Sequence, residues 1–288
     1  MHFIVLAMLA LHAPALIRTA DAIQPTHAVQ PTAGGILREE TLSSAALGRD
    51  MKYRVLLPNG YDTSPKRYPV LYLLHGLGGN YTDWTMRTNL AEYSRSVALI
   101  IVMPDGENSW YTNTQDGSSK FEDYITTDLP ADVVKKYRTI NSRYGRAIAG
   151  LSMGGYGALK LALKRPAQFA VVGAFSGAFS ITQDLETKLG ATDAAQVKTI
   201  FGAADSQARK DNDVFMVAAA TKPAGAPYVY VDCGTSDGLL QTNRDVAEAI
   251  QKSGLAYEYH EVSGAHTWDY WDRRIRVFLP ILMSKLAN

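Results

Sequence analysis

The stretch from Arg146 to Lys164 reads RAIAGLSMGGYGALKLALK. Its first residues, Arg146 to Ala149, are typical of a short strand, and the residues from about Met153 predict a helix that Pro166 ends. The turn between them has the pattern Gly-x-Ser-x-Gly at residues 150–154. This pattern alone arises by chance in many chains, but a strand before it and a helix after it indicate a sharp strand-to-helix turn.

The rest of the chain alternates between strand-like and helix-like segments, which predicts a mostly parallel, doubly wound sheet. The strand-like segments are Met51 to Leu57, Val70 to Leu74, Ala98 to Met103, Val171 to Phe175, Tyr228 to Cys233 and Tyr257 to Glu261. The other predicted helices are Phe121 to Tyr137, Asn243 to Lys252 and Trp268 to Leu286. Residues 176–227 depart from this alternation, and we expect a small helical insertion there.

Ser152 stands at the centre of the strand-to-helix turn. Such a turn needs neighbours that carry almost no side chain, which explains Gly150 and Gly154. It holds the serine hydroxyl above the strand ends, at the positive end of a helix dipole, where a base can reach it. We therefore expect the α/β-hydrolase fold with Ser152 as nucleophile. The alternative is a glycine-rich turn with an incidental serine.

The general base is expected among the three histidines that follow the N-terminal segment. His75 ends a predicted strand, and His260 lies inside one. His266 lies in the loop after that strand, within SGAHTW at residues 263–268, where a partly exposed base belongs. We expect His266 to be the base rather than an ordinary loop histidine.

A carboxylate should orient that histidine, and in this fold it comes between the serine and the histidine along the chain. Asp237 lies in the loop that follows the strand Tyr228 to Cys233. Asp232 competes with it, but Asp232 lies within the strand, where side-chain direction alternates. We favour Asp237 as the residue that holds the tautomer of His266, against the alternative of a solvated turn residue.

A glycine-rich loop, His75-Gly76-Leu77-Gly78-Gly79, follows the apolar strand Val70 to Leu74. It is similar to the loops whose backbone amides face a developing oxyanion. The expected donors are the N–H of Leu77 and that of Met153, the residue after the nucleophile. The alternative is a glycine-rich connection with no role in chemistry.

Six segments, in order and at plausible spacing, extend this pattern over about residues 36–286. They are YLLHGLGGNYTDW (72–84), PDGENSWYTN (104–113), FEDYITTDLP (121–130), GLSMGGYGAL (150–159), CGTSDGLL (233–240) and GAHTWDYW (264–271). Together they resemble the esterase-D-like family of α/β-hydrolases. That family includes tributyrin-type acylesterases, feruloyl and acetyl-xylan esterase domains, S-formylglutathione hydrolases and mycobacterial mycolyltransferases.

The resemblance implies a triad of Ser152, Asp237 and His266 with the amides of Leu77 and Met153, as the residues themselves indicate. It implies a serine carboxylesterase that acts on short-chain acyl or aromatic (feruloyl or acetyl) esters through an acyl-enzyme, without metal or cofactor. The loop at residues 75–79 lacks the cysteine-bearing feature of formylglutathione hydrolases, so that substrate is not expected. An acyltransferase with the same triad and a catalytically silent binding protein are the alternatives.

Aromatic and apolar side chains near the predicted loops could line an acyl pocket for a small-molecule or carbohydrate-linked ester. Ordinary core or rim positions are the alternative for each of them. These residues are Trp84, Trp110, Tyr111, Phe179, Leu239 and Trp268.

The composition of the chain excludes some classes of protein. The 288 residues carry 29 Lys and Arg against 28 Asp and Glu, with no basic stripe typical of a nucleic-acid binder. Cys233 is the only cysteine, which excludes an internal disulfide.

Residues 1–22, with a short apolar run and Ala20-Asp21-Ala22, are typical of a signal peptide, although no Lys or Arg precedes the run. Residues 23–35 are a predicted flexible spacer, residues 36–288 the catalytic domain, and the protein is expected to be secreted or periplasmic.

Overall fold

The computed structural model of this chain describes residues 36–183 and 191–286. The predicted signal peptide and spacer, residues 1–35, lie outside the described residues. Within the described part, no helix is long and apolar enough to cross a membrane.

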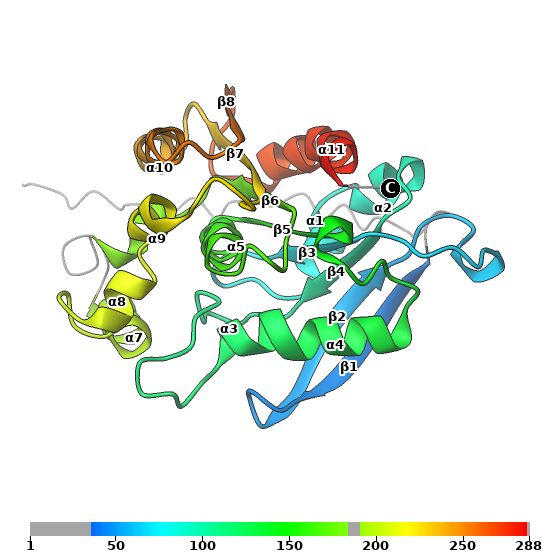
Figure 1. Cartoon of the computed structure of the whole chain (residues 1–288), viewed down its shortest axis with the longest axis horizontal. Coiled ribbons are helices and arrows are strands. Elements are labelled where there is room, and N and C mark those ends of the chain that lie inside the picture. The colour runs from blue at the N-terminus through cyan, green and yellow to red at the C-terminus, as the bar shows by residue number, and fades with distance from the viewer. Residues whose placement is uncertain (1–35, 184–190, 287–288) are drawn as a thin grey trace, which may run out of the picture.

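An eight-stranded sheet forms the centre of the molecule, in the order β1-β2-β4-β3-β5-β6-β7-β8 (Figure 1). The first two strands are antiparallel to each other, and β2 is antiparallel to β4; all other neighbours are parallel. This is the predicted mostly parallel sheet of the α/β-hydrolase fold. The strands are β1 (Leu37–Ser44), β2 (Arg49–Leu56), β3 (Val70–Leu74), β4 (Ile100–Pro104), β5 (Arg146–Leu151), β6 (Val171–Phe175), β7 (Tyr228–Gly234) and β8 (Tyr257–Val262).

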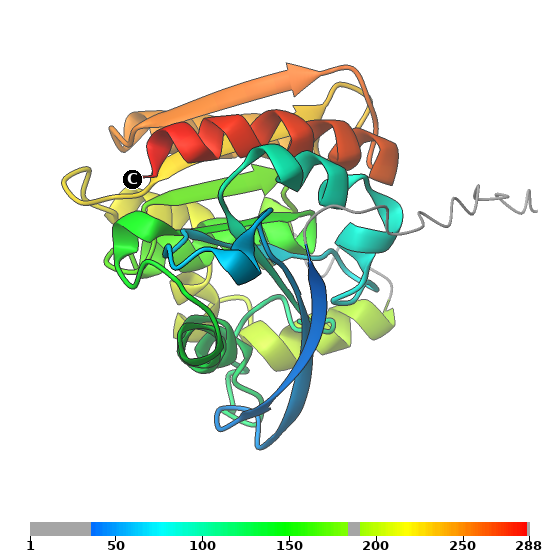
Figure 2. The ribbon, with the colours of Figure 1, turned by 90° about the vertical axis from the view of Figure 1, so that its right-hand side faces the viewer.

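Helices cover both faces of this sheet. One face packs against α4 (Leu129–Lys136), α5 (Met153–Lys164) and α10 (Leu240–Lys252), which share one cluster of buried residues with the strands. The other face packs against α1 (Asp83–Arg87), α2 (Leu90–Tyr93) and α11 (Trp268–Lys285), as Figure 2 shows for the long α11. All residues of β3, β4 and β6 are buried, because strands covered on both faces leave neither side to solvent.

The predicted helix from Phe121 to Tyr137 is present from Phe121 to Lys136, with one π-helical turn inside it. It consists of α3 (Phe121–Asp123), a π-helical turn (Tyr124–Asp128) and α4, with Pro130 near the start of α4. Pro130 follows the π-helical turn, where the regular hydrogen bonds of the α-helix are already altered. Pro280 lies inside α11 (Trp268–Lys285), which continues past it.

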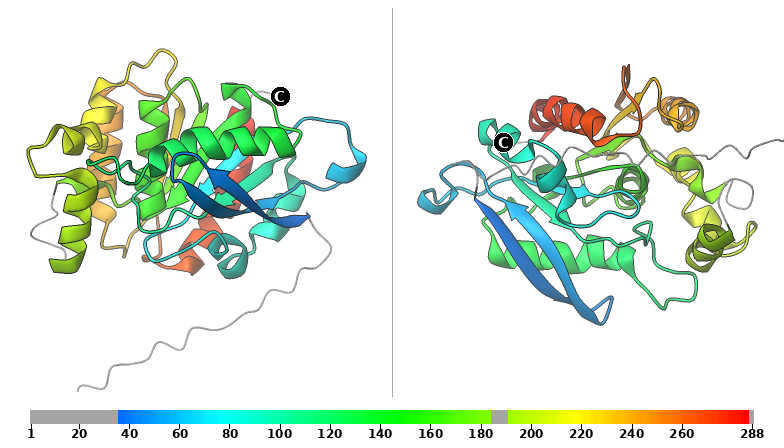
Figure 3. Two further views of the ribbon diagram at one scale, coloured as in Figure 1. Left: turned by 90° about the horizontal axis from the view of Figure 1, so that it is seen from below. Right: turned by 180° about the vertical axis from the view of Figure 1, so that it is seen from behind.

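The predicted insertion between β6 and β7 is confirmed as a group of short helices. Its described helices are α7 (Ala191–Phe201), α8 (Gln207–Asp211) and α9 (Val214–Ala220), and they gather on one side of the molecule (Figure 3). The hydroxyl of Tyr156 on α5 donates to the carbonyl of Asn212, 2.6 Å away, and fastens the insertion to the helix that follows Ser152.

The parallel register brings the carboxyl ends of the central strands to one edge of the sheet. Leu151 at the end of β5 pairs with Phe175 of β6, and Phe175 pairs with Asp232 near the end of β7. The loops after β3, β5, β7 and β8 therefore emerge side by side, which is where ligands bind in sheets of this kind. Cys233, near the end of β7, is fully buried.

Candidate active site

Ser152 occupies a strained turn between β5 and α5. Its φ of 53° and ψ of −116° are rarely adopted by a residue with a side chain. The chain can turn so tightly because of two glycines: a Cβ on Gly150 would lie 2.5 Å from the carbonyl carbon of Gly154, and one on Gly154 would lie 2.6 Å from the carbonyl oxygen of His75. The turn thus presses the start of α5 against the loop that begins at His75.

We expect Gly150→Ala to lower the free energy of unfolding by about 3 kcal/mol or more, because the new Cβ meets backbone rather than a movable side chain. Urea unfolding measures this loss. Gly238→Ala is the control, since a Cβ at Gly238 meets no atom within 4 Å and should change stability by less than about 0.5 kcal/mol. Equal stability of the two variants would contradict the tight turn.

The three predicted triad side chains come together from separate loops. Ser152 Oγ lies 3.0 Å from Nε2 of His266. The other ring nitrogen of His266, Nδ1, lies 2.9 Å from Oδ2 of Asp237. With Nδ1 donating to the carboxylate, Nε2 is left as an acceptor for the serine hydroxyl proton. This geometry allows His266 to take a proton from Ser152.

Asp237 has the environment of an orienting carboxylate. Its side chain is 1% exposed, and its Oδ1 accepts a hydrogen bond of 2.8 Å from the N–H of Leu239. Burial alone would raise the pKa of Asp237, but the hydrogen bonds from His266 and Leu239 hold it below the ordinary value. Asp237 is therefore ionised at neutral pH and can stabilise a protonated His266.

Asp232, the alternative acid, bonds to side chains other than His266. It is fully buried and bonded to three side chains: Nε of Arg274 at 2.8 Å and the hydroxyls of Tyr230 at 2.7 Å and Tyr270 at 3.0 Å. These partners belong to β7 and α11, on the face of the sheet that α11 covers. Asp232 thus forms a buried ion pair that joins α11 to the sheet.

The loop at residues 75–79 lies directly beside the serine, since a Cβ on Gly76 would be 3.5 Å from Cβ of Ser152. The amide of Met153 is the first of α5, and the first N–H groups of a helix have no partner within the helix. Leu77 is 49% exposed. Both predicted oxyanion donors thus lie in segments adjacent to Ser152, and their role remains a prediction.

A second loop, between β4 and α3, supports the first and was not singled out from the sequence for this role. The Oδ1 of Asn108 accepts a 2.7 Å hydrogen bond from the N–H of Gly78. The N–H of Gly106 donates to Nε2 of His75 at 2.8 Å, and the hydroxyl of Tyr111 donates to the carbonyl of His75 at 2.9 Å. His75 is therefore a structural link between two loops, with its ring 1% exposed.

The predicted acyl pocket needs correction at three positions. Trp84, Tyr111 and Phe179 are at most 1% exposed and serve as core residues. The indole of Trp84 packs against Phe175 and donates to the carbonyl of Leu74 at 3.0 Å. Their apolar character made them pocket candidates, but the sequence did not indicate that neighbouring side chains enclose them.

Two of the remaining pocket candidates lie closer to the surface. Trp110 is 5% exposed, whereas Leu239 and Trp268 are half-buried. The Trp268 ring contacts that of Trp271, which in turn meets the His266 ring edge-on at 4.9 Å. Leu239 and Trp268 therefore border the triad.

A groove of about 450 Å³ runs between the loop after β4 and helix α7. Asn108, which holds Gly78, is one of its lining residues, so the groove adjoins the loop beside Ser152. Most other side chains of the lining are hydroxyls or amides, including Ser109, Thr112, Gln196 and Thr199. Among the described residues there is no group of three or more His, Cys, Asp or Glu side chains that could hold a metal.

The family model described as "Putative esterase" matches residues 44–280, which include every residue of the predicted triad. The chain belongs to this esterase family. The esterase is 30% identical over 222 residues to an acetyl esterase of Caldicellulosiruptor saccharolyticus, covering 74% of this chain and 83% of that protein. It is 28% identical to the diacylglycerol acyltransferase/mycolyltransferase Ag85B of Mycobacterium leprae over 277 residues, covering 84% and 82%. It spans only 54% of the length of the Mycobacterium tuberculosis esterases that it also matches.

Solved structures agree with this membership. A ferulic acid esterase superposes with a TM-score of 0.76 at 26% identity, covering 88% of this chain and 99% of that one. The predicted family, fold and enzyme class are thereby confirmed: the chain is an α/β-hydrolase of the carboxylic ester hydrolase class.

Proposed function

We propose that this esterase is a serine carboxylesterase in which Ser152, His266 and Asp237 form the catalytic triad. The observation that carries the proposal is the pair of contacts made by His266, 3.0 Å to Ser152 Oγ and 2.9 Å to Asp237 Oδ2. A serine in a strained turn, a base within reach and an ionised carboxylate behind the base form the arrangement that activates a hydroxyl nucleophile.

The reaction then proceeds in two acyl-transfer steps. Ser152 Oγ attacks the ester carbonyl carbon while Nε2 of His266 takes the hydroxyl proton, and the N–H groups of Leu77 and Met153 stabilise the oxyanion. The carbon–oxygen bond to the alcohol breaks as His266 protonates the leaving oxygen. A water molecule, deprotonated by the same histidine, attacks the acyl-enzyme and releases the acid and free Ser152.

We propose that the ester substrate joins a short or aromatic acyl group to a polar alcohol. The relatives named acetyl esterase and ferulic acid esterase suggest a short or aromatic acyl group. Hydroxyl and amide side chains line the groove beside Asn108, and such groups suit a carbohydrate-linked alcohol. Residues 1–22 support export, and we propose a secreted or periplasmic location for the mature esterase.

A panel of esters tests this function. We expect hydrolysis of p-nitrophenyl acetate and butyrate to exceed that of the octanoate, and kcat/KM to be higher for a feruloyl ester of arabinose than for methyl ferulate. The sugar ester adds contacts in the groove, whereas the methyl ester does not. A preference for octanoate, or equal kcat/KM for the two ferulates, would contradict the proposed substrate.

Acyl transfer to an alcohol is the second candidate, because the chain covers 82% of the mycolyltransferase Ag85B. The same acyl-enzyme can be attacked by a sugar hydroxyl instead of water. Product analysis with an added sugar acceptor separates the two: free acid alone indicates a hydrolase, and a new ester that grows with acceptor concentration indicates a transferase.

A further inference from the structure

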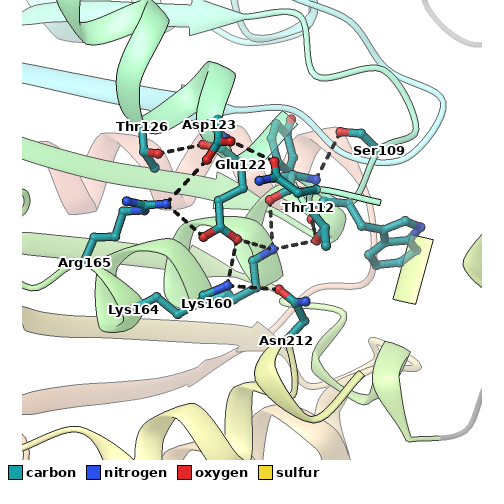
Figure 4. Close-up of polar contacts among 12 residues, drawn as sticks. Ser109, Thr112, Glu122, Asp123, Thr126, Lys160, Lys164, Arg165 and Asn212 are labelled. Atoms are coloured by element: carbon teal, nitrogen blue, oxygen red, sulfur yellow. Dashed lines mark hydrogen bonds and ion pairs between the residues drawn. The ribbon is translucent and has the colours of Figure 1, made fainter. Parts of the chain in front are cut away.

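A fully buried lysine lies near the middle of the helix that follows Ser152. Nζ of Lys160 donates to the carbonyl oxygen of Tyr111 at 2.8 Å and to Oγ1 of Thr112 at 2.6 Å, as Figure 4 shows for Thr112. Its third neighbour is Oε2 of Glu122, 3.5 Å away. The side chain is 0% exposed, so its three donors are directed entirely at protein groups.

The carboxylate of Glu122 is shared with two further cations. Lys164 Nζ lies 2.9 Å from Oε2 of Glu122, and Nη2 of Arg165 lies 3.4 Å from Oε1 (Figure 4). Burial would raise the pKa of Glu122, but Lys160 and Lys164 hold it below the ordinary value. The charge of Glu122 is therefore compensated by Lys164 and Arg165 even without Lys160. What Lys160 alone supplies is the pair of hydrogen bonds to Tyr111 and Thr112.

Those hydrogen bonds hold a strained piece of backbone. Trp110 and Tyr111 have φ values of 54° and 51°, in the left-handed region that residues with side chains seldom occupy. Such conformations persist only when the surroundings enforce them. Lys160 donates to the backbone carbonyl at this point. Gly106 and Gly157 leave room for the Tyr111 ring, since a Cβ on either glycine would lie 2.2 or 2.5 Å from its atoms.

The far end of Tyr111 reaches the loop beside Ser152. Its hydroxyl donates to the carbonyl of His75 at 2.9 Å, and its ring meets that of His75 at a centroid distance of 5.9 Å. Gly76 and Leu77 follow directly in the chain. A continuous path of hydrogen bonds thus runs from Lys160 through Tyr111 to the residue that begins the predicted oxyanion loop.

We propose that Lys160 is a positioning residue of the oxyanion hole, fixing the loop at residues 75–79 through Tyr111. This inference rests on the proposed function, because it assumes that the Leu77 amide stabilises the oxyanion. Both donors of the hole are then set by one helix: Met153 begins α5, and Lys160 of α5 holds Leu77 in place through Tyr111 and His75. The oxyanion forms only when Ser152 attacks the ester, so the two amides act chiefly on the transition state.

Lys160→Met tests the proposal, since methionine fills a similar volume without hydrogen-bond donors. A donor displaced by about 1 Å can cost about 100-fold in rate, so we expect kcat per active site to fall about 10- to 100-fold with KM nearly unchanged. Active sites are counted by end-point labelling with a fluorophosphonate. The Ki of a trifluoromethyl ketone, whose adduct with Ser152 carries an oxyanion, should rise by the same factor.

Lys164→Met is the matched control. It lies one turn further along the same helix and loses an ion pair to the same Glu122, but its recorded partners are Glu122 and Asn212 rather than the loop at residues 110–112. We expect its kcat and Ki to match those of wild type. Equal falls in both lysine variants, or a fall in active-site concentration without a change in kcat per site, would show that Lys160 only stabilises the fold.

Tyr111→Phe keeps the inference testable if Lys160→Met does not fold, because it removes the single hydroxyl that bonds to His75. Wild-type kcat and Ki in folded Tyr111→Phe would overturn the proposal. Ser152→Ala separates this failure from that of the proposed function. An active Ser152→Ala enzyme would refute the triad itself, whereas an inactive one beside a fully active Lys160→Met would refute only the role of Lys160.

Discussion

Replacing Ser152 with alanine is expected to lower kcat for ester hydrolysis by a factor on the order of 10⁶, the effect that loss of the nucleophile has in serine hydrolases. The substitution removes the oxygen that lies 3.0 Å from Nε2 of His266. Without it no acyl-enzyme can form, and only water activated by the histidine remains to attack the ester. The measurement is kcat for p-nitrophenyl acetate, together with the mass added by a fluorophosphonate, which should be zero in the variant.

Ser253→Ala provides the matched control for Ser152→Ala. Ser253 follows α10, and its hydroxyl bonds to the carbonyl of Ala249 at 2.8 Å without a contact to the triad. We expect wild-type kcat and full labelling in this variant. Wild-type activity in folded Ser152→Ala would instead remove Ser152 from the mechanism.

Local sequence patterns were sufficient to predict the turn at Ser152 and the segments of the parallel sheet. Gly150 is needed because the backbone of Gly154 packs against it, and Gly154 is needed because the backbone of Leu74 and His75 packs against it. The order of the loops follows from the order of parallel strands, so the meeting of Ser152 and His266, 114 residues apart, could also be anticipated. Both inferences depend on periodicity and chain order, which a single sequence contains.

Burial by distant side chains could not be inferred in the same way. Tyr111 was predicted to line a pocket, yet its ring is enclosed by Gly106 and Gly157, and only the folded chain brings these together. The strand β1 was not predicted, because only two of its eight residues, Leu37 and Leu42, are apolar, and they do not produce the alternation typical of a strand. Lys160 did leave a signal in the sequence: it is the only charged residue from Met153 to Leu163, a segment that the structure buries completely.

The second large effect is expected for Asp237→Asn, which should lower kcat about 10⁴-fold. Asn has nearly the shape of Asp, but its amide can donate a hydrogen bond to Nδ1 of His266. That donation would favour the tautomer with a proton on Nε2, the nitrogen that must accept the proton of Ser152. The carboxylate that stabilises the protonated histidine is also lost. The measurement is kcat with p-nitrophenyl acetate at pH 7.

Asp232→Asn distinguishes the two carboxylates that the sequence left as competitors. Asp232 neutralises Arg274, which is buried with it between β7 and α11, and removing one charge of such a pair costs about 3 kcal/mol of stability or more. We therefore expect Asp232→Asn to unfold at a lower urea concentration with kcat within about threefold of wild type, because the substitution leaves the contacts of His266 intact. We expect Asp237→Asn to show the opposite result, a low kcat with nearly unchanged stability. Its partner His266 is partly exposed, so the loss of the carboxylate charge costs little stability but removes the group that orients the base. If Asp232→Asn were the inactive variant and Asp237→Asn the active one, Asp232 would be the acid of the triad.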